Sequence, residues 1–360
     1  MAPKKILIVD DSALTRRVLC DIINSDSRFN VEGMANNGLE ALKLLDQRTF
    51  DGIITDINMP RMNGLEFLKE LKTRKREERV MVLSTETTEG ARVTLDALEL
   101  GAVDFIQKPQ SAIYSKDQDF IKRFFGILEA VVFSNRKASS GIYRNTVVLK
   151  PGSLIAKVDS AAVPKEGKGN KIVAIASSTG GPKALQNVIP RLPKNLDAPV
   201  LVVQHMPVGF TRSLAERLNA MSEVTVSEAV DGEMLEKGHV YISKGGAHMN
   251  YQDAGGRGRI VYTDEPSREG VKPCANYMYE SLVKSPFHTV VCVVLTGMGH
   301  DGTEGIQNLV KAKNTYIIAE DEKSCVVNGM PGSIVATGLV NEVVDIDQVA
   351  QSILANVGVR

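Results

Sequence analysis

Two stretches of this sequence alternate short, wholly apolar runs with segments whose apolar residues recur at helical spacing. In the first stretch, residues 4–130, the apolar runs predict strands at Ile6–Val9, Gly52–Ile54, Val80–Leu83 and Val103–Ile106. The helical spacing predicts helices at Ser12–Ile23, Gly38–Leu45, Gly64–Leu71, Thr88–Leu100 and Asp119–Val132. Buried strands that alternate with helices indicate βαβ units, and therefore a parallel sheet covered by helices.

The second stretch begins at Lys171 and repeats the pattern. It predicts strands at Ile172–Ala176, Val200–Val203, Thr289–Leu295 and Thr315–Ala319. It predicts helices at Pro182–Ile189, Thr211–Met221 and Thr303–Lys311. Between these elements lies a region at about residues 224–262, in which Val224–Glu228 and Val240–Ser243 alternate apolar and polar residues. This region predicts an antiparallel edge or hairpin on the main sheet.

The chain therefore divides into two α/β domains, each an open, mainly parallel sheet flanked by helices. We place them at residues 1–132 and 170–360. The segment 133–169 between them is polar and rich in breakers at both ends, which is typical of an interdomain linker.

Composition limits the cellular compartment and the kinds of partner that we expect for this protein. Lys and Arg together number 43, as do Asp and Glu, and this neutral balance counts against a nucleic-acid partner. The four cysteines include no C-x-x-C pair, so the sequence favours neither disulfides nor a zinc site. No apolar run approaches the ~20 residues of a membrane span, and the first strand follows Met1 too closely for a signal peptide. We expect a cytoplasmic protein without membrane insertion.

Polar residues stand at the carboxyl ends of the first domain's strands. Asp10 and Asp11 follow the first strand, Asp56 and Ser84 end two later ones, and Lys108 follows the last. In an open parallel sheet these ends form one rim, where ligands bind. Each residue alone can be a helix cap, a turn former or a solvated loop residue, but their convergence favours a functional site.

The residue types on this rim indicate phosphoryl chemistry. Clustered carboxylates need a cation, and an all-oxygen site with few protein ligands suits Mg²⁺. A carboxylate can accept a phosphoryl group, and the transfer needs mainly positioning and charge neutralisation. We predict Asp56 as the phosphorylated nucleophile, Asp10 and Asp11 as metal ligands, and Lys108 and Ser84 as ligands of the phosphoryl oxygens.

The first domain resembles the response-regulator receiver domain. The resemblance rests on four segments: Ile-Leu-Ile-Val-Asp10-Asp11-Ser, Thr-Asp56-Ile-Asn58-Met-Pro, Met-Asn63-Gly64 and Gln-Lys108-Pro109. It implies a flavodoxin-like fold and phosphorylation of Asp56 by a histidine kinase. It also implies Mg²⁺ bound by Asp10, Asp11, Asp56 and the backbone carbonyl of Asn58.

Two residues of the switch mechanism follow from the same resemblance. The switch hydroxyl maps to Ser84, and the adjacent Thr85 is the alternative. The aromatic ring that turns inward on activation maps to Phe105, where many relatives have tyrosine.

The second domain opens with a strand, a glycine turn and a helix. The turn reads Ser177-Ser178-Thr179-Gly180-Gly181-Pro182, and the helix start presents free N–H groups that suit an anion or oxyanion. A serine here is a candidate nucleophile or a phosphate ligand, although helix capping is the ordinary role of such a residue. Neither G-x-S-x-G nor G-x-G-x-x-G is present, which counts against an α/β-hydrolase elbow and a dinucleotide site.

A nucleophilic serine needs a base, and the base needs an orienting group. His205 follows the strand at 200–203, and Asp301 follows the one at 289–295, so both lie at the same sheet edge as Ser178. His300 is the competing base, but it neighbours Asp301 in sequence and is more simply explained as a surface turn residue. The arrangement predicts a Ser178–His205–Asp301 triad.

These segments resemble the catalytic domain of the chemotaxis protein-glutamate methylesterases, the CheB family. The matching motifs are Ser178-Thr-Gly-Gly, Val-Val-Gln-His205-Met-Pro, Leu-Thr-Gly-Met298-Gly-His-Asp301-Gly and Asn-Gly-Met330-Pro-Gly. Two departures are His300, where relatives often carry Asn, and Ser177, where a small apolar residue is usual. We choose Ser178 over Ser177 because it directly precedes Thr-Gly-Gly.

The resemblance implies a Rossmann-like, doubly wound catalytic domain that needs no cofactor and hydrolyses glutamyl methyl esters of chemoreceptors. It points to Met298 for the oxyanion N–H, with Thr179 and Gly180 as further candidates. It implies that the unphosphorylated receiver covers the catalytic face, and some relatives also deamidate receptor glutamine. The alternatives are a phosphorylation-controlled interaction module with a non-catalytic second domain, a DNA-binding output and, more weakly, a nucleotide site at Gly180-Gly181.

Overall fold

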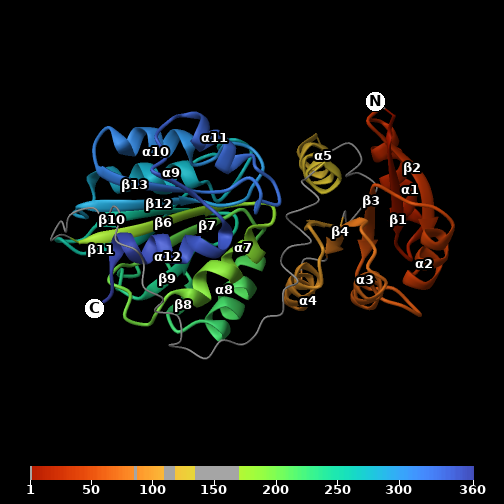
Figure 1. Cartoon of the computed structure of the whole chain (residues 1–360), viewed down its shortest axis with the longest axis horizontal. Helices are drawn as coiled ribbons and strands as arrows, with labels where there is room; N and C mark the ends of the chain where they lie inside the picture. Colours follow the sequence, from red (N-terminus) through yellow and green to blue (C-terminus); the bar gives the residue numbers. More distant parts are fainter. Residues whose placement is uncertain (1, 85–86, 109–117, 134–169) are drawn as a thin grey trace.

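The computed structural model describes residues 2–84, 87–108, 118–133 and 170–360, which form two α/β domains (Figure 1). Thr85 and nearly all of the proposed linker lie outside the described residues. Phe133, which we assigned to the linker, is the last residue of the helix that ends the first domain. None of the described helices combines the length and apolar character needed to cross a membrane.

The N-terminal domain is a five-stranded parallel sheet in the order β2-β1-β3-β4-β5, the flavodoxin-like order that we expected. Its strands are β1 (Lys4–Val9), β2 (Phe29–Ala35), β3 (Gly52–Asp56), β4 (Arg79–Ser84) and β5 (Asp104–Gln107). Its helices are α1 (Ala13–Asn24), α2 (Gly38–Gln47), α3 (Gly64–Thr73), α4 (Thr88–Glu99) and α5 (Gln118–Phe133).

The strand pleat sends alternate side chains to opposite faces of this sheet. Ile6 and Ile8 pack with α1 and α5, whereas Leu7 and Val9 pack with α2 and α3. Both sets are fully buried. Helices therefore cover both faces, and the carboxyl ends of the strands remain open as a rim.

The C-terminal domain is a seven-stranded sheet in the order β14-β13-β12-β6-β7-β9-β8, and all of its described pairs are parallel. Its strands are β6 (Lys171–Ser177), β7 (Val200–Gln204), β8 (Thr225–Glu228), β9 (His239–Ile242), β12 (Thr289–Val294), β13 (Asn314–Glu320) and β14 (Glu342–Val344). Its helices are α7 (Gly181–Val188), α8 (Phe210–Met221), α9 (Ala275–Ser281), α10 (Thr303–Val310), α11 (Met330–Ala336) and α12 (Ile346–Val357).

The antiparallel edge or hairpin that we expected on the main sheet at about residues 224–262 is wrong for that sheet. β8 and β9 both lie at the sheet edge, but they run parallel to each other and to β7. Alternation of apolar and polar residues indicates a strand, but it does not distinguish the two strand directions. An antiparallel hairpin does occur next along the chain, as the separate pair β10 (His248–Asp253) and β11 (Gly258–Thr263).

The strand order of the larger sheet reverses at β6. The chain goes from β6 to β7 on one side, and later from β12 to β13 and β14 on the other. The carboxyl ends of β6, β7 and β12 therefore surround a topological switch point, where doubly wound sheets bind ligands.

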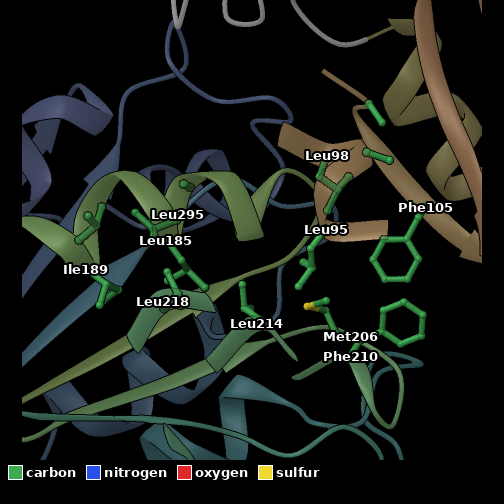
Figure 2. Packing of buried hydrophobic residues seen from close by; sticks show 14 of the residues in the cluster. Leu95, Leu98, Phe105, Leu185, Ile189, Met206, Phe210, Leu214, Leu218 and Leu295 are labelled. Carbon is green, nitrogen blue, oxygen red and sulfur yellow. The ribbon is translucent and has the colours of Figure 1, made fainter. Parts of the chain in front are cut away.

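The two domains pack through α4, α5 and β5 of the smaller one. In Figure 2, Leu95 and Leu98 of α4 lie beside Leu214 and Met206 of the larger domain, in one continuous cluster of buried apolar side chains. The rings of Phe105 in β5 and Phe210 in α8 stack with their centroids 4.6 Å apart (Figure 2).

Ion pairs border this apolar contact. Arg217 of α8 binds Asp96 at 2.7 Å and Glu99 at 2.8 Å, both at the end of α4. Arg92 of α4 binds Glu216 of α8 at 3.1 Å.

Candidate functional site

The rim of the N-terminal sheet brings the predicted carboxylates together. One oxygen from each of Asp10, Asp11 and Asp56 lies within 4.8 Å of the others. Lys108 Nζ lies 2.9 Å from both Asp10 Oδ2 and Asp56 Oδ2. Three carboxylates and one ammonium from three strand ends thus meet, as the sequence predicted.

Backbone groups fix two of these carboxylates. The Ser12 N–H donates to Asp10 Oδ1 at 2.8 Å, and the Ile57 N–H donates to Asp56 Oδ1 at 2.8 Å. Asp10 and Asp56 are buried, whereas Asp11 is exposed. Burial raises the pKa of Asp10 despite its contact with Lys108. Burial alone would lower the pKa of Lys108. The hydrogen bonds from Lys108 to Asp10 and Asp56 outweigh this effect and raise the pKa.

This donor set fits a magnesium ion. The three carboxylates offer hard oxygen ligands close together, and the exposed Asp11 leaves one side open to water and phosphate. Asn58 lies two residues beyond Asp56 in the loop before α3, and its side chain is exposed. A bound divalent cation would stabilise the ionised form of Asp10, which burial disfavours.

The predicted switch residues occupy defined positions. Ser84 ends β4 and is buried, with its Oγ 2.5 Å from Thr94 Oγ1 of α4. Thr94 itself donates to the Gly90 carbonyl at 2.6 Å, so Ser84 is the donor in the pair. Phe105 is buried against Phe210 of the other domain. The structure therefore connects this rim to the domain contact through β4, α4 and β5.

In the C-terminal domain, two of the three predicted triad side chains are in direct contact. His205 Nε2 lies 2.7 Å from Asp301 Oδ2, and both side chains are almost fully buried. Asp301 follows β12, next to Gly302, which has φ +94° and starts α10. Burial would raise the pKa of Asp301, but the hydrogen bond and electrostatic interaction with His205, together with further donors, lower it to about 2.

The further donors to Asp301 come from the start of α9, which sequence reasoning did not identify. The Ala275 N–H donates to Oδ2 at 2.6 Å, the Asn276 N–H to Oδ1 at 2.9 Å, and Cys274 Sγ lies 3.0 Å from Oδ1. A helix N-terminus thus holds the carboxylate as an anion. No motif in the sequence announces this contact, because two of its donors are backbone groups 25–26 residues away.

Ser178 lies between β6 and α7, at the same edge as His205 and Asp301. Its N–H donates to the Thr296 carbonyl at 3.0 Å, which fixes it beside the loop after β12. Gly297 in that loop has room only for a hydrogen, because a Cβ there would come within 2.8 Å of Ser178 Cβ. Ser178 is partly exposed, as a nucleophile must be.

The neighbouring Ser177 is fully buried, and its hydroxyl donates to Gln204 Oε1 at 2.6 Å. A hydroxyl in that position is closed to substrate. The structure therefore favours Ser178 over Ser177, as the sequence analysis did.

Candidate oxyanion donors surround Ser178. Within the part of the chain that the structure describes, neither the Thr179 nor the Met298 N–H has a hydrogen-bond acceptor. Gly180 has φ +77° and is the residue before α7, where the helix presents its free N–H groups. A cluster of free backbone donors beside a serine can stabilise a tetrahedral oxyanion.

His300 lies away from the serine. Its side chain is 67% exposed, and Nε2 is 3.3 Å from Glu269 Oε2. The structure thus agrees with the surface role that we assigned to it and leaves His205 as the partner of Asp301.

Comparison with known proteins finds a family match in each half of the chain. A family model for the CheB methylesterase matches residues 173–353, and one for the response regulator receiver domain matches residues 6–114. The chain is 41% identical over 355 residues to the protein-glutamate methylesterase/protein-glutamine glutaminase of Bacillus subtilis (strain 168), covering 97% of each protein. It is 37% identical over 350 residues to the protein of the same description from Pyrococcus abyssi, covering 97% of this chain and 92% of that protein.

One solved structure compares closely with the second domain. The crystal structure of the Thermotoga maritima CheB methylesterase catalytic domain is 40% identical, with a TM-score of 0.50, and the match covers 51% of this chain and 97% of that one. The chain therefore belongs to the CheB methylesterase family, with a response regulator receiver domain ahead of the domain that holds Ser178, His205 and Asp301.

Proposed function

We propose that this protein is a phosphorylation-activated serine hydrolase that removes methyl esters from glutamyl side chains of chemoreceptors and releases methanol. The observation that carries this proposal is the contact between His205 Nε2 and the buried carboxylate of Asp301, at the sheet edge where Ser178 begins the glycine turn. Such an Asp–His pair next to a serine is the machinery of acyl transfer.

The proton path follows from the ring orientation. Asp301 occupies Nε2, so Nδ1 of His205 is the nitrogen left to accept the Ser178 proton. The serine oxygen attacks the ester carbonyl, and the oxyanion is stabilised by backbone N–H groups from Met298, Thr179 or Gly180. One such donor contributes roughly 3–4 kcal/mol. The methoxy oxygen takes the proton from His205 as its bond to the carbonyl carbon breaks, and methanol leaves. Water then hydrolyses the acyl-enzyme by the same route in reverse.

The same machinery can act on a side-chain amide. The tetrahedral intermediate is analogous, and His205 would protonate the leaving amide nitrogen, so that ammonia departs in place of methanol. The relatives' description as methylesterase and glutaminase supports extending the proposal to receptor glutamine.

In the receiver, Asp56 would take a phosphoryl group from a histidine kinase. Asp10, Asp11, Asp56 and the Asn58 carbonyl would hold Mg²⁺, which neutralises charge on the phosphoryl oxygens when it is bound. Lys108 already spans Asp10 and Asp56 and is placed to bind one phosphoryl oxygen, and Ser84 would bind another after leaving Thr94.

Control of the esterase would come from the packed receiver. Burial raises the pKa of Asp104 in β5 to about 6, and the interaction of its carboxyl with Thr179, the residue after the proposed nucleophile, opposes this rise. A Cβ on Gly126 of α5 would meet the Met298 side chain at 3.1 Å. Receiver residues thus lie next to Thr179 and Met298, two of the proposed oxyanion donors. This position supports the proposal that the receiver blocks the substrate path until phosphorylation loosens the domain contact. A shift from 1:99 to 99:1 would need about 5.5 kcal/mol.

The partners follow from this function: methylated chemoreceptors as substrates and a histidine kinase as phosphodonor, met in the cytoplasm, with no role for nucleic acid. The alternative, an interaction module without catalysis, gives no reason for a carboxylate held by three donors besides His205.

The test is methanol release from methylated chemoreceptor fragments, with and without a small-molecule phosphodonor and Mg²⁺. Release should rise on phosphorylation, should not rise in Asp56→Asn, and should vanish in Ser178→Ala while the fold persists. Equal turnover with and without phosphodonor would refute the control mechanism. Full activity of Ser178→Ala would refute the assignment of Ser178 as the nucleophile.

A further inference from the structure

We propose that Gln204 is a positioning residue of the esterase, which holds the nucleophile and the base at a fixed separation through its side-chain amide. The inference rests on the proposed function for its activity readout, but the contacts that carry it stand on their own. Gln204 is the last residue of β7 and immediately precedes His205.

The amide of Gln204 connects the ends of two strands. Its Nε2 donates to the Ser178 carbonyl at 3.0 Å and to the His205 carbonyl at 3.1 Å. Its Oε1 accepts the Ser177 hydroxyl at 2.6 Å. Carbonyl oxygens only accept, so the nitrogen must face them, and the amide orientation is determined by its partners.

This link begins where the sheet ends. β6 and β7 pair in parallel up to Ser177 and Gln204, and the His205 N–H donates to the Ser177 carbonyl at 3.1 Å. In the described part of the chain, that is the final backbone hydrogen bond between the two strand ends. The Gln204 amide extends the connection one residue further, to the backbone of Ser178 itself.

The site is built to hold this side chain. Gln204 is 1% exposed, so its amide has no access to bulk water and depends on these partners. Gly181 provides the space, because a Cβ there would lie 1.9 Å from Gln204 Oε1 and 3.0 Å from Ser177 Cβ. Glycine at 181 is thus required by the amide and not by a left-handed backbone.

The consequence for catalysis is geometric. Serine attack requires the hydroxyl, the imidazole and the ester in near-contact alignment, and a displacement of about 1 Å can cost about 100-fold in rate. Gln204 touches neither the substrate nor the reacting atoms. Its effect passes through the backbone of Ser178 and His205, so its loss should lower kcat and leave KM almost unchanged.

The experiment compares five variants of the full chain under phosphodonor and Mg²⁺. Gln204→Leu removes all three hydrogen bonds at similar volume. Gln204→Glu keeps the shape but cannot donate to two carbonyls. Gly181→Ala displaces the amide without altering it. Val200→Ala is the control, because it opens a cavity in the same buried strand far from the loop. Thermal unfolding and circular dichroism establish that each variant is folded.

We expect the Gln204 variants to lose about 100-fold in kcat with KM within about threefold, and Gly181→Ala to lose kcat in the same direction. A fluorophosphonate probe should label Ser178 more slowly by a similar factor, whatever the true ester substrate. Val200→Ala should keep its kcat despite a lower Tm. Ser177→Ala, which retains both carbonyl contacts, should lose far less.

Wild-type kcat and labelling rate in folded Gln204→Glu would overturn the inference. So would an equal loss in Val200→Ala, since that would make stability the cause. If the wild type released no methanol but its Ser178 were labelled normally by the phosphonate, the proposed substrate would be wrong. The labelling rates of the variants would then decide the role of Gln204.

Discussion

The carboxylate of Asp301 has a partner on each of its oxygens, which fixes its orientation toward His205. Its Oδ2 accepts from His205 and from the Ala275 N–H, and its Oδ1 accepts from the Asn276 N–H and faces Cys274. Asp301→Asn places an NH₂ group against one of these donors, whichever way the amide turns. We expect kcat to fall by about 10³–10⁴-fold and Tm to drop. Methanol release and thermal unfolding measure the two effects, and near-normal turnover would contradict the orienting role.

Glu320 provides a test of pH dependence at the level of one residue. It ends β13, is 2% exposed, and accepts the Thr296 N–H at 2.8 Å and the Ser324 hydroxyl at 3.0 Å. Burial raises its pKa to about 7 in spite of these donors. The folded state therefore favours the protonated carboxyl, so the free energy of unfolding should fall as pH rises from about 4.5 to about 7, and then level off.

Glu320→Gln removes this titration. It should flatten the stability profile between pH 4.5 and 7 and make the variant more stable than the wild type at pH 8, by up to about 3 kcal/mol. Urea unfolding at pH 5 and pH 8 measures the difference. Asp253→Asn, at an exposed carboxyl of β10, is the control. Parallel pH profiles for wild type and Glu320→Gln would refute the assignment.

The sequence predicted which proposed site residues share a sheet edge better than it predicted the groups that hold them in place. Ser178, His205, Asp301 and the receiver carboxylates were found because reactive side chains at the ends of buried strands must share an edge. Gln204, Cys274 and Glu320 were not found, because each acts on backbone groups or on a neighbour distant in sequence. A partner of this kind leaves no spacing pattern to read.

At the scale of elements, the start of α3 is packed directly against Asp56 and Ile57, at the end of β3 and the start of the loop that follows it. The Gly64 N–H donates to the Ile57 carbonyl at 2.8 Å, and a Cβ on Gly64 would lie 2.4 Å from the Asp56 carbonyl oxygen. These are backbone atoms, which cannot turn aside. The capping box of Asn63 and Glu66 fixes the helix end on the other side.

Gly64→Ala should therefore move Asp56 and slow its phosphorylation, and should destabilise the receiver by roughly 1–3 kcal/mol. Phosphotransfer from a small-molecule donor and the Tm of the first transition measure both effects. Gly332→Ala is the matched control, because the nearest atoms to its Cβ belong to the Asn328 side chain at 3.3 Å. A normal phosphorylation rate in Gly64→Ala would contradict this prediction, because it would mean that the backbone accommodates the added Cβ without displacing Asp56.

Element prediction succeeded where burial was continuous and failed where it was partial. β3 is buried along its whole length and was recognised, although the structure extends it to Asp56. β2 was not assigned residues, because only its ends, Phe29 and Ala35, are buried. β8 and β9 were recognised as strands but given the wrong direction, since alternation of side chains does not encode it.

For the whole molecule, the decisive quantity is the free energy that keeps the two domains packed. Arg217 of α8 reaches both Asp96 and Glu99 of α4, and its side chain is 23% exposed. Such partly screened pairs contribute about 1 kcal/mol. Under the proposed control mechanism, in which the packed form is the inactive one, loss of that amount would raise the population of the open form by about fivefold.

Arg217→Ala should thus increase methanol release by the unphosphorylated protein about fivefold, while the fully phosphorylated rate stays the same because the contact is already open there. Arg191→Ala is the control, since Arg191 has the same charge but pairs with Asp347 inside the catalytic domain. An unphosphorylated Arg217→Ala protein with wild-type turnover would mean that this contact does not hold the inactive form. A rise in both states would place its effect on catalysis itself and not on domain packing.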